Sequence, residues 1–227
     1  MARKRSRRYE KASAKVDRAK RYPLTEGMAL IKSLVGPKFD ESVDVAVRIG
    51  IDAKKTDQLV RGSVSLPKGT GKTIRIAVFA EGAKAQEALD AGADFVGAAD
   101  LAEKIEKGFT DFDMTIASPD MMRFVGKLGK VLGPQGKMPS PKAGTVTPNV
   151  AAAVREFKAG KIEFRTDAGA NVHATIGKKS FAADDLAVNL TAFLDHLRTL
   201  RPSQAKGEFI KKVVVSTSMG PGVALAV

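Results

Sequence analysis

The spacing of apolar residues changes twice along this chain, and that change restricts the possible folds more than any other feature of the sequence. Over residues 43–51, apolar residues alternate with polar or small ones, which is the two-residue period of a strand with one buried face. Over residues 73–158, dense apolar strands alternate with helical segments, a pattern typical of a parallel sheet covered by helices. Over residues 161–176 the two-residue alternation returns. The sequence therefore predicts two domains of different class.

The predicted fold class combines α+β and α/β in a discontinuous two-domain protein. Residues 1–68 and 160–227 are expected to form an open α+β domain with an antiparallel sheet made from both chain ends. Residues 69–159 are expected to form an inserted, Rossmann-like parallel α/β domain. Because the chain crosses between the domains twice, each crossing can act as a hinge. The expected hinge residues are Lys68, Gly69, Ala159 and Gly160.

Local signals predict individual elements of the divided domain. A strand over residues 60–66 follows the first strand across a polar turn. The alternation over residues 161–176 is interrupted by turn residues at 167–171, which predicts a hairpin. Ser180 suits the cap of a long helix with an apolar stripe, and residues 209–217 are expected to form a last strand.

Composition excludes several classes of function. Because the chain has no Cys, it cannot form disulfides, thiolate zinc sites or a thiol nucleophile. With only His173 and His196, a histidine metal cluster is also excluded, so no metal and no cofactor are expected. No apolar run approaches the roughly 20 residues that a membrane span needs, and the N-terminus lacks the apolar region of a secretory signal. We therefore expect a soluble, cytoplasmic protein without a membrane partner.

The formal net charge of +13 indicates a polyanionic partner such as nucleic acid. Residues 1–21 carry ten basic and two acidic side chains, and 10 minus 2 gives +8 of that total. We interpret this segment as a basic arm that binds phosphates regardless of base sequence. The alternatives are a solubilising tail and, with less support because no bulky apolar face accompanies the charge, a membrane-surface segment. The arm residues are Arg3, Lys4, Arg5, Arg7 and Arg8.

A second basic segment, Gly126–Thr145, has the sequence GKLGKVLGPQGKMPSPKAGT. Its five glycines permit positive φ, and its three prolines prevent regular helix over the second half. We predict a shaped loop held by apolar anchors, with a plain solvated surface loop as the alternative. The anchors are Leu128, Val131, Leu132 and Met138, and the basic residues are Lys127, Lys130, Lys137 and Lys142.

No motif supports catalysis or nucleotide binding. The segment LPKGTGKT at residues 66–73 is similar to a phosphate-binding loop, but Leu66 replaces the first glycine and a strand follows where a helix is required. His173 and His196 have no motif that links them to a Ser or an Asp. The sequence therefore predicts that the chain is not an enzyme.

Three short segments of the divided domain carry binding signals. A cation and an aromatic, Lys38 and Phe39, precede the first strand, with a core position as the alternative for Phe39. Two lysines and Ser180 lie at a strand-to-helix junction, where a helix N-terminus favours phosphate. The last strand ends in two hydroxyls, a thioether and a glycine, which suit the 2′-OH groups and sugars of folded RNA, with a plain turn as the alternative. The candidate RNA-binding residues are Lys38, Phe39, Lys178, Lys179, Ser180, Thr217, Ser218, Met219 and Gly220.

The order of these segments resembles a known family. The run LGKVLGPQGKMP followed by PKAGTV is similar to the L-one family of large-subunit ribosomal proteins of bacterial type. The similarity extends over nearly the whole chain, through RYEKA, GPKFDESVDVAVRIGID, VRGSVSLPKGTGK, KIEFRTDAGANVHATIGKKSF and STSMGP. The resemblance implies the same divided two-domain plan. It also implies that Glu41, Arg165 and His173 lie near the candidate residues on an RNA-binding face. Ser218 stands where the family often has Thr, which keeps the hydroxyl but loses a methyl contact.

The function implied by the resemblance is that of a structural constituent of the large ribosomal subunit, bound to folded large-subunit rRNA as a monomer within the ribosome. The resemblance further implies that the protein assists release of deacylated tRNA from the exit site and represses its own operon mRNA. A nucleotide-dependent RNA-modifying enzyme that uses the parallel sheet is the alternative. Saturable binding of ATP or S-adenosylmethionine would favour that enzyme.

Overall fold

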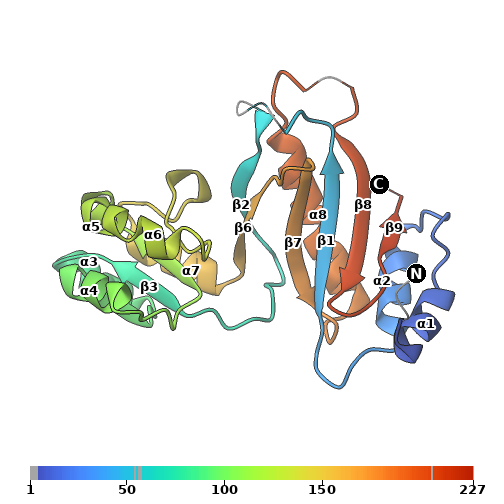
Figure 1. Cartoon of the computed structure of the whole chain (residues 1–227), viewed down its shortest axis with the longest axis horizontal. Coiled ribbons are helices and arrows are strands. Elements are labelled where there is room, and N and C mark those ends of the chain that lie inside the picture. Colours follow the sequence, from blue (N-terminus) through green and yellow to red (C-terminus); the bar gives the residue numbers. More distant parts are fainter. Residues whose placement is uncertain (1–4, 54, 56–57, 206, 227) are drawn as a thin grey trace. The chain divides into compact units, whose positions relative to one another are not determined.

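The chain folds into two compact units in a computed structural model, which describes residues 5–53, 55, 58–205 and 207–226 (Figure 1). Unit 1 comprises Met1–Gly71 and Ile162–Val227, and unit 2 comprises Lys72–Lys161. Unit 1 holds an antiparallel sheet and unit 2 a parallel one, so the predicted fold class is confirmed.

The main sheet of unit 1 is built around β1, the strand with the two-residue period. Its strand order is β7-β1-β8-β9, and all neighbours are antiparallel. A separate two-stranded sheet pairs β2 with β6. The strands are β1 (Ser42–Ile49), β2 (Arg61–Ser65), β6 (Lys161–Arg165), β7 (Asn171–Lys178), β8 (Ile210–Thr217) and β9 (Val223–Leu225).

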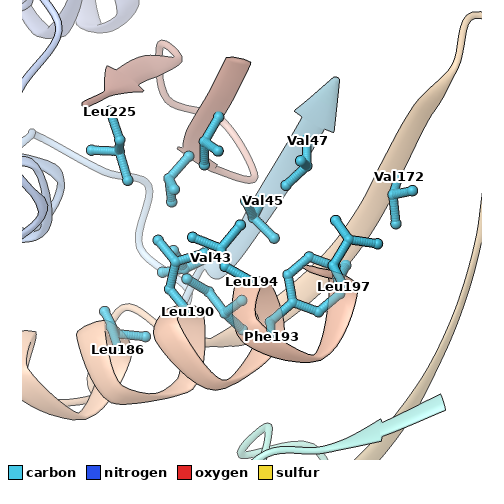
Figure 2. Close-up of a cluster of buried hydrophobic side chains, with 14 of the residues drawn as sticks. Val43, Val45, Val47, Val172, Leu186, Leu190, Phe193, Leu194, Leu197 and Leu225 are labelled. Atoms are coloured by element: carbon cyan, nitrogen blue, oxygen red, sulfur yellow. The ribbon is translucent and has the colours of Figure 1, made fainter. Parts of the chain in front are cut away.

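One face of this sheet is covered by α8 (Ala183–Thr199), with α2 (Leu24–Ser33) packed against α8 and β9. Figure 2 shows the α8 side chains directed at the sheet, where they meet alternate residues of β1. Each fully buried aliphatic or aromatic side chain contributes about 1.5–3 kcal/mol. The buried set includes Val43, Val45, Val47, Leu186, Leu190, Phe193, Leu194 and Leu197. The intervening β1 residues Asp44 and Ala46 are only half-buried, on the opposite face of the sheet.

The predicted hairpin over residues 161–176 is wrong as a strand pairing. β6 pairs with β2 and β7 pairs with β1, and only the single bridge Thr166–Val172 joins the two segments among the residues described. The predicted turn does form, because one carboxylate oxygen of Asp167 accepts from the backbone N–H groups of Gly169 (2.8 Å) and Asn171 (2.7 Å). These hydrogen bonds, chiefly with Asn171, lower the pKa of Asp167 to about 2. The sequence period determined the buried faces but not the strand partners.

Unit 2 is a three-stranded parallel sheet with strand order β4-β3-β5. Helices α4, α5 and α6 supply the apolar cluster on one face, and α3 and α7 supply the other. All four residues of β3 are buried, as expected for a strand covered on both sides. The elements are β3 (Ile76–Phe79), α3 (Ala83–Asp90), β4 (Phe95–Gly97), α4 (Ala99–Glu106), β5 (Met114–Ala117), α5 (Met122–Lys127), α6 (Gly129–Leu132) and α7 (Val150–Lys158), with 3₁₀ turns at Pro119–Met121 and Pro141–Ala143.

The basic segment Gly126–Thr145 is helical in its first part, so the prediction of a loop throughout is wrong. Helix α5 extends to Lys127, and α6 follows immediately. Leu128 and Leu132 lie four residues apart and are both fully buried, and this burial favours helix over the flexibility of the intervening Gly129. The apolar anchors were correctly predicted, since Val131 and Met138 also pack on the core of unit 2.

The first chain crossing is held inside unit 1 by Asn189 of α8. This side chain is fully buried, and its Oδ1 accepts from the Lys68 N–H at 3.0 Å. Its Nδ2 donates to the carbonyls of Gly69 (2.9 Å) and Ile176 (2.8 Å). Bending at the predicted hinge residues Lys68 and Gly69 would break these bonds. At the second crossing, Ala159 is the C-cap of α7 and Gly160 has a φ of +112°, a conformation that favours glycine.

Candidate nucleic-acid interface

Three loops of unit 1 meet at one end of the main sheet. Because β1 runs antiparallel to both neighbours, its first residues lie beside the last residues of β7 and β8: Ser42 pairs with Lys178, and Val43 pairs with Thr217. Most of the candidate residues are therefore brought together. We call this group the strand-end site, and it consists of Lys38, Phe39, Glu41, Lys178, Lys179, Ser180, Thr217, Ser218, Met219 and Gly220.

Large apolar side chains are exposed at the strand-end site. Phe39 is 54% exposed and Met219 is 52% exposed, so the core alternative for Phe39 is wrong. Val35, also 52% exposed, lies on the same connection between α2 and β1 as Phe39. Lys38 is exposed in this loop, and it forms no ion pair among the residues that the structure describes. An aromatic ring, a thioether and a cation are the groups that pack on and neutralise a nucleotide.

Glu41 and Lys179 are occupied within the protein. Glu41 is 1% exposed; its Oε1 accepts from the Met219 N–H at 2.9 Å, and its Oε2 lies 3.3 Å from Lys179 Nζ. Lys179 Nζ also donates to the Leu34 carbonyl at 2.6 Å. The Glu41 carboxylate is therefore closed to solvent, while the Lys179 side chain is 19% exposed and is bonded to two groups of the protein.

The Ser218 hydroxyl at the end of β8 also has a partner inside the protein. Ser218 Oγ accepts from the Ser42 N–H at 3.1 Å, while the Ser218 N–H donates to the Ser42 carbonyl at 3.1 Å. Thr217 is buried, and its carbonyl accepts from the Gly220 N–H at 3.1 Å in a tight turn. The sequence did not reveal the Ser218 bond, because its partner lies 176 residues away along the chain.

The predicted helix cap at Ser180 is wrong. Helix α8 begins at Ala183 with Ala182 as its cap, so Ser180 is not the cap residue. The Ser180 N–H and hydroxyl donate to the Asp40 carboxylate at 3.1 and 2.8 Å. The first turn of the helix carries Asp184 and Asp185, which would repel a phosphate. Lys178 remains half-exposed, and its Nζ donates to Ser42 Oγ at 3.0 Å.

Two residues named by the family resemblance lie away from the strand-end site. His173 pairs with Ala46, four residues along β1 from Ser42, or about 13 Å at 3.3 Å per residue. It is exposed, with Nε2 at 3.3 Å from Asp167 Oδ2. Arg165 is exposed at the end of β6, in the two-stranded sheet. These two side chains can reach RNA only if the RNA extends beyond the strand ends.

The basic arm is partly a docked helix. Helix α1 (Arg7–Ala14) is capped by Ser6, and Ala12 is buried in the core of unit 1. The Arg5 guanidinium lies over the Tyr9 ring, 4.6 Å from its centroid. Arg7 is exposed and Arg8 is half-buried, while Arg3 and Lys4 lie outside the described residues.

The lysines of Gly126–Thr145 in unit 2 differ from one another. Lys127, Lys130 and Lys142 are exposed, and within the described parts of the chain none of them forms an ion pair. Lys137 is half-buried; its Nζ donates to the Thr110 carbonyl at 3.0 Å and lies 4.9 Å from the centroid of the Phe112 ring. Three of the four predicted cations are therefore available to a ligand, and Lys137 is a structural residue.

The described residues contain no group of three or more His, Asp or Glu side chains that could hold a metal ion. They also contain no helix that combines the length and apolar character of a membrane span.

Comparison with known proteins identifies the family. The model of the ribosomal protein L1p/L10e family matches residues 30–221. The chain belongs to this family. It is 57% identical over 218 residues to the large ribosomal subunit protein uL1 of Methylobacillus flagellatus, covering 96% of this chain and 95% of that protein. It is 54% identical over 220 residues to the uL1 protein of Nitrosomonas eutropha, covering 97% and 95%.

Family membership decides between the two functional classes that the sequence left open. The matched family consists of structural ribosomal proteins, so the prediction that the chain is not an enzyme is confirmed. The alternative of a nucleotide-dependent RNA-modifying enzyme is set aside. The candidate RNA-binding residues stay a prediction, because the comparisons match the chain as a whole and not its single side chains.

Proposed function

We propose that this protein is a structural constituent of the large ribosomal subunit and binds folded large-subunit rRNA through the strand-end site. The observation that carries the proposal is the exposure of Phe39 and Met219 beside Lys38 at one end of an antiparallel sheet. Its relatives are named as large-subunit ribosomal proteins, which agrees with an rRNA ligand. The protein would act as a monomer within the ribosome, in the cytoplasm, without a cofactor or a membrane partner.

Each exposed group has a distinct part in this proposal. The Phe39 ring and the Met219 thioether pack on sugars or unstacked bases, which gives recognition by shape. Lys38 and the basic arm neutralise phosphates and supply affinity that does not depend on base sequence. The backbone of Ser218 and Met219 is held by bonds to β1 and Glu41, so it meets the ligand without a cost of ordering.

Two further functions, in tRNA release and in translational repression, are proposed from the lysines of unit 2 and from the RNA shape that the strand-end site recognises. We propose that Lys127, Lys130 and Lys142 contact the phosphates of deacylated tRNA at the exit site and assist its release. We also propose that the operon mRNA of this protein presents the same RNA shape as the rRNA, so that it binds the strand-end site in competition and translation is repressed.

The rRNA proposal is tested by separating the two units. Kd is measured for a fragment of large-subunit rRNA and for a scrambled fragment of equal length. A variant in which a short glycine linker replaces residues 72–161 should retain most of the affinity and the discrimination between the two RNAs. Isolated residues 72–161 should bind far more weakly and without discrimination. Equal affinity of the two parts would overturn the assignment of the site to unit 1.

The tRNA proposal is tested by removing charge from unit 2. Replacement of Lys127, Lys130 and Lys142 by Gln should weaken tRNA binding and leave rRNA binding unchanged. The control replaces Lys84, Lys104 and Lys107 of the same unit by Gln, which removes the same charge elsewhere. If both triple variants lose tRNA affinity equally, tRNA binding depends on the net charge of unit 2 and not on this segment.

The mRNA proposal is tested by competition. The operon transcript should displace the rRNA fragment competitively, and simultaneous binding of both RNAs would refute a shared site.

A further inference from the structure

We infer that Glu41 is a positioning residue for RNA recognition: its buried carboxylate fixes the exposed groups of the strand-end site without itself touching RNA. The inference rests on the proposed function, since it explains how that site keeps its shape. It gives Glu41 a structural role in place of a direct contact with RNA, and it gives Gly36 a role in the same site.

The contacts of Glu41 connect the three loops of the site. Its Oε1 accepts a hydrogen bond from the Met219 N–H (2.9 Å), and its Oε2 forms an ion pair with Lys179 Nζ (3.3 Å). The Glu41 carbonyl accepts from the Lys179 N–H at 2.8 Å, and Lys179 Nζ reaches the Leu34 carbonyl at the end of α2. One carboxylate thus links the loop before β1 to the ends of β7 and β8, and its lysine partner extends the link to α2.

The burial of Glu41 restricts the linked loops to few geometries. A carboxylate that is 1% exposed is stable only while it is paired and hydrogen-bonded, because removing a charge from water has a large free-energy cost. A buried ion pair adds little net stability compared with apolar residues, but it tolerates few alternative geometries. The Met219 backbone and the Phe39 loop are therefore held in one arrangement relative to each other.

Gly36 supplies an independent observation. A Cβ atom at this position would lie 2.4 Å from Glu41 Oε2 and 2.8 Å from Lys179 Nζ. Both atoms are fixed by the bonds described above, so an added methyl group would displace the ion pair. The φ of Gly36 is not in the left-handed region, so its effect would be steric and not conformational. Gly36→Ala therefore disturbs the pair without removing a charge.

The test measures Kd for the rRNA fragment and the hydrogen-exchange rate of the Met219 amide, at a temperature where every variant is folded. Glu41→Ala should weaken RNA binding about ten- to a hundredfold and accelerate exchange at Met219. The slope of log Kd against log salt should not change, because no phosphate contact is lost. Glu41→Gln, which keeps an acceptor for the Met219 N–H, should restore part of the affinity. The matched control is Glu163→Gln, which removes the carboxylate paired with Arg61 outside the strand-end site and should change neither readout.

Gly36→Ala should reproduce the effect of Glu41→Ala to a smaller degree, and it tests the inference even if the Glu41→Ala variant does not fold. RNA affinity within about twofold of the unaltered protein in both Glu41→Gln and Gly36→Ala would overturn the inference. Failure of the unaltered protein to bind the RNA would instead refute the proposed function. In that case the Met219 exchange rate, which is measured without RNA, still decides whether Glu41 fixes this loop.

Discussion

The two units differ in how firmly the groups available to a ligand are held by the rest of the protein. In unit 1, most polar groups around the strand-end site are bonded to neighbouring parts of the protein, while Lys38 and the apolar Phe39 and Met219 face solvent. In unit 2, Lys127 and Lys130 stand on short helices with no ion pair among the described residues. A fixed surface can reject a ligand of the wrong shape, whereas free cations attract any polyanion. We therefore expect unit 1 to discriminate between RNA shapes and unit 2 to attract RNA regardless of its shape.

The largest effect should come from a charge placed on the fixed surface. Met219→Asp brings a carboxylate close to phosphate and should weaken the specific complex by about a hundredfold, with a melting temperature close to that of the unaltered protein because the side chain is exposed. Leu89→Asp makes the same kind of change at a 48% exposed position in unit 2 and should alter rRNA binding less than about twofold. The affinity is measured by titration of labelled RNA. Equal losses of rRNA affinity in the two variants would show that unit 1 does not discriminate more strongly than unit 2.

The basic arm should behave like unit 2 although it belongs to unit 1. Replacing Arg3, Lys4, Arg7 and Arg8 by Gln removes charge while keeping Arg5 on the Tyr9 ring. Each lost phosphate contact should reduce the slope of log Kd against log salt by about 0.7–0.9, and discrimination against scrambled RNA should be unchanged. Titrations at several salt concentrations measure the slope. A loss of discrimination at constant slope would show that the arm recognises RNA shape.

A smaller effect is expected at Ser218, whose hydroxyl is bonded inside the protein. Ser218→Ala removes the bond to the Ser42 N–H and should lower the free energy of unfolding by about 0.5–1.5 kcal/mol. The melting temperature should fall by about 2–4 °C per kcal/mol. Ser216→Ala, on the same strand, has no side-chain hydrogen bond to lose within the described chain and serves as the control. A loss of RNA affinity without a change in melting temperature would mean that the hydroxyl serves RNA and not the sheet.

The smallest effect is the titration of Asp167 in the turn before β7. Hydrogen bonds from Asn171 and Gly169 stabilise the ionised carboxylate, so its pKa in the folded protein is about 2, below the ordinary 3.8. A lowered pKa means that the contribution to stability is present above about pH 4 and is lost as pH falls through 2. The Asn171 amide resonance should therefore titrate with a midpoint near 2. A midpoint near the ordinary value of 3.8 would show that the turn is not fixed in solution.

Much of the fold could be predicted from the sequence, because the spacing of apolar residues is a local property. The alternation that predicted β1 and the helical stripe that predicted α8 both describe buried faces, and these faces meet in the structure. The partner of β2 was not predictable in this way, since any strand with the same alternation could have paired with it. Helix α6 was missed because two buried leucines outweighed the glycines around them.

The sequence indicated which residues could form the candidate site, but not the contacts that each of them makes within the protein. The order of the strands brings Lys38, Phe39 and Met219 to the same end of the main sheet. The roles of Glu41 and Ser218 depend on partners 138 and 176 residues away, and no local pattern in the sequence contains them. A charged residue directly before a strand suggests a solvated loop, whereas the folded chain encloses the Glu41 carboxylate and leaves it 1% exposed.

The central position of β1 has a consequence for how the chain folds as it is made. β1 ends at Ile49, but its neighbours begin only at Asn171 and Ile210. At about 5–20 residues per second, the gap of about 120 residues before β7 lasts roughly 6–24 s during synthesis. All of unit 2 emerges within that interval and can fold on its local contacts. The apolar face of β1 stays without its sheet for the whole time, so the unit that begins the chain is the last to be completed.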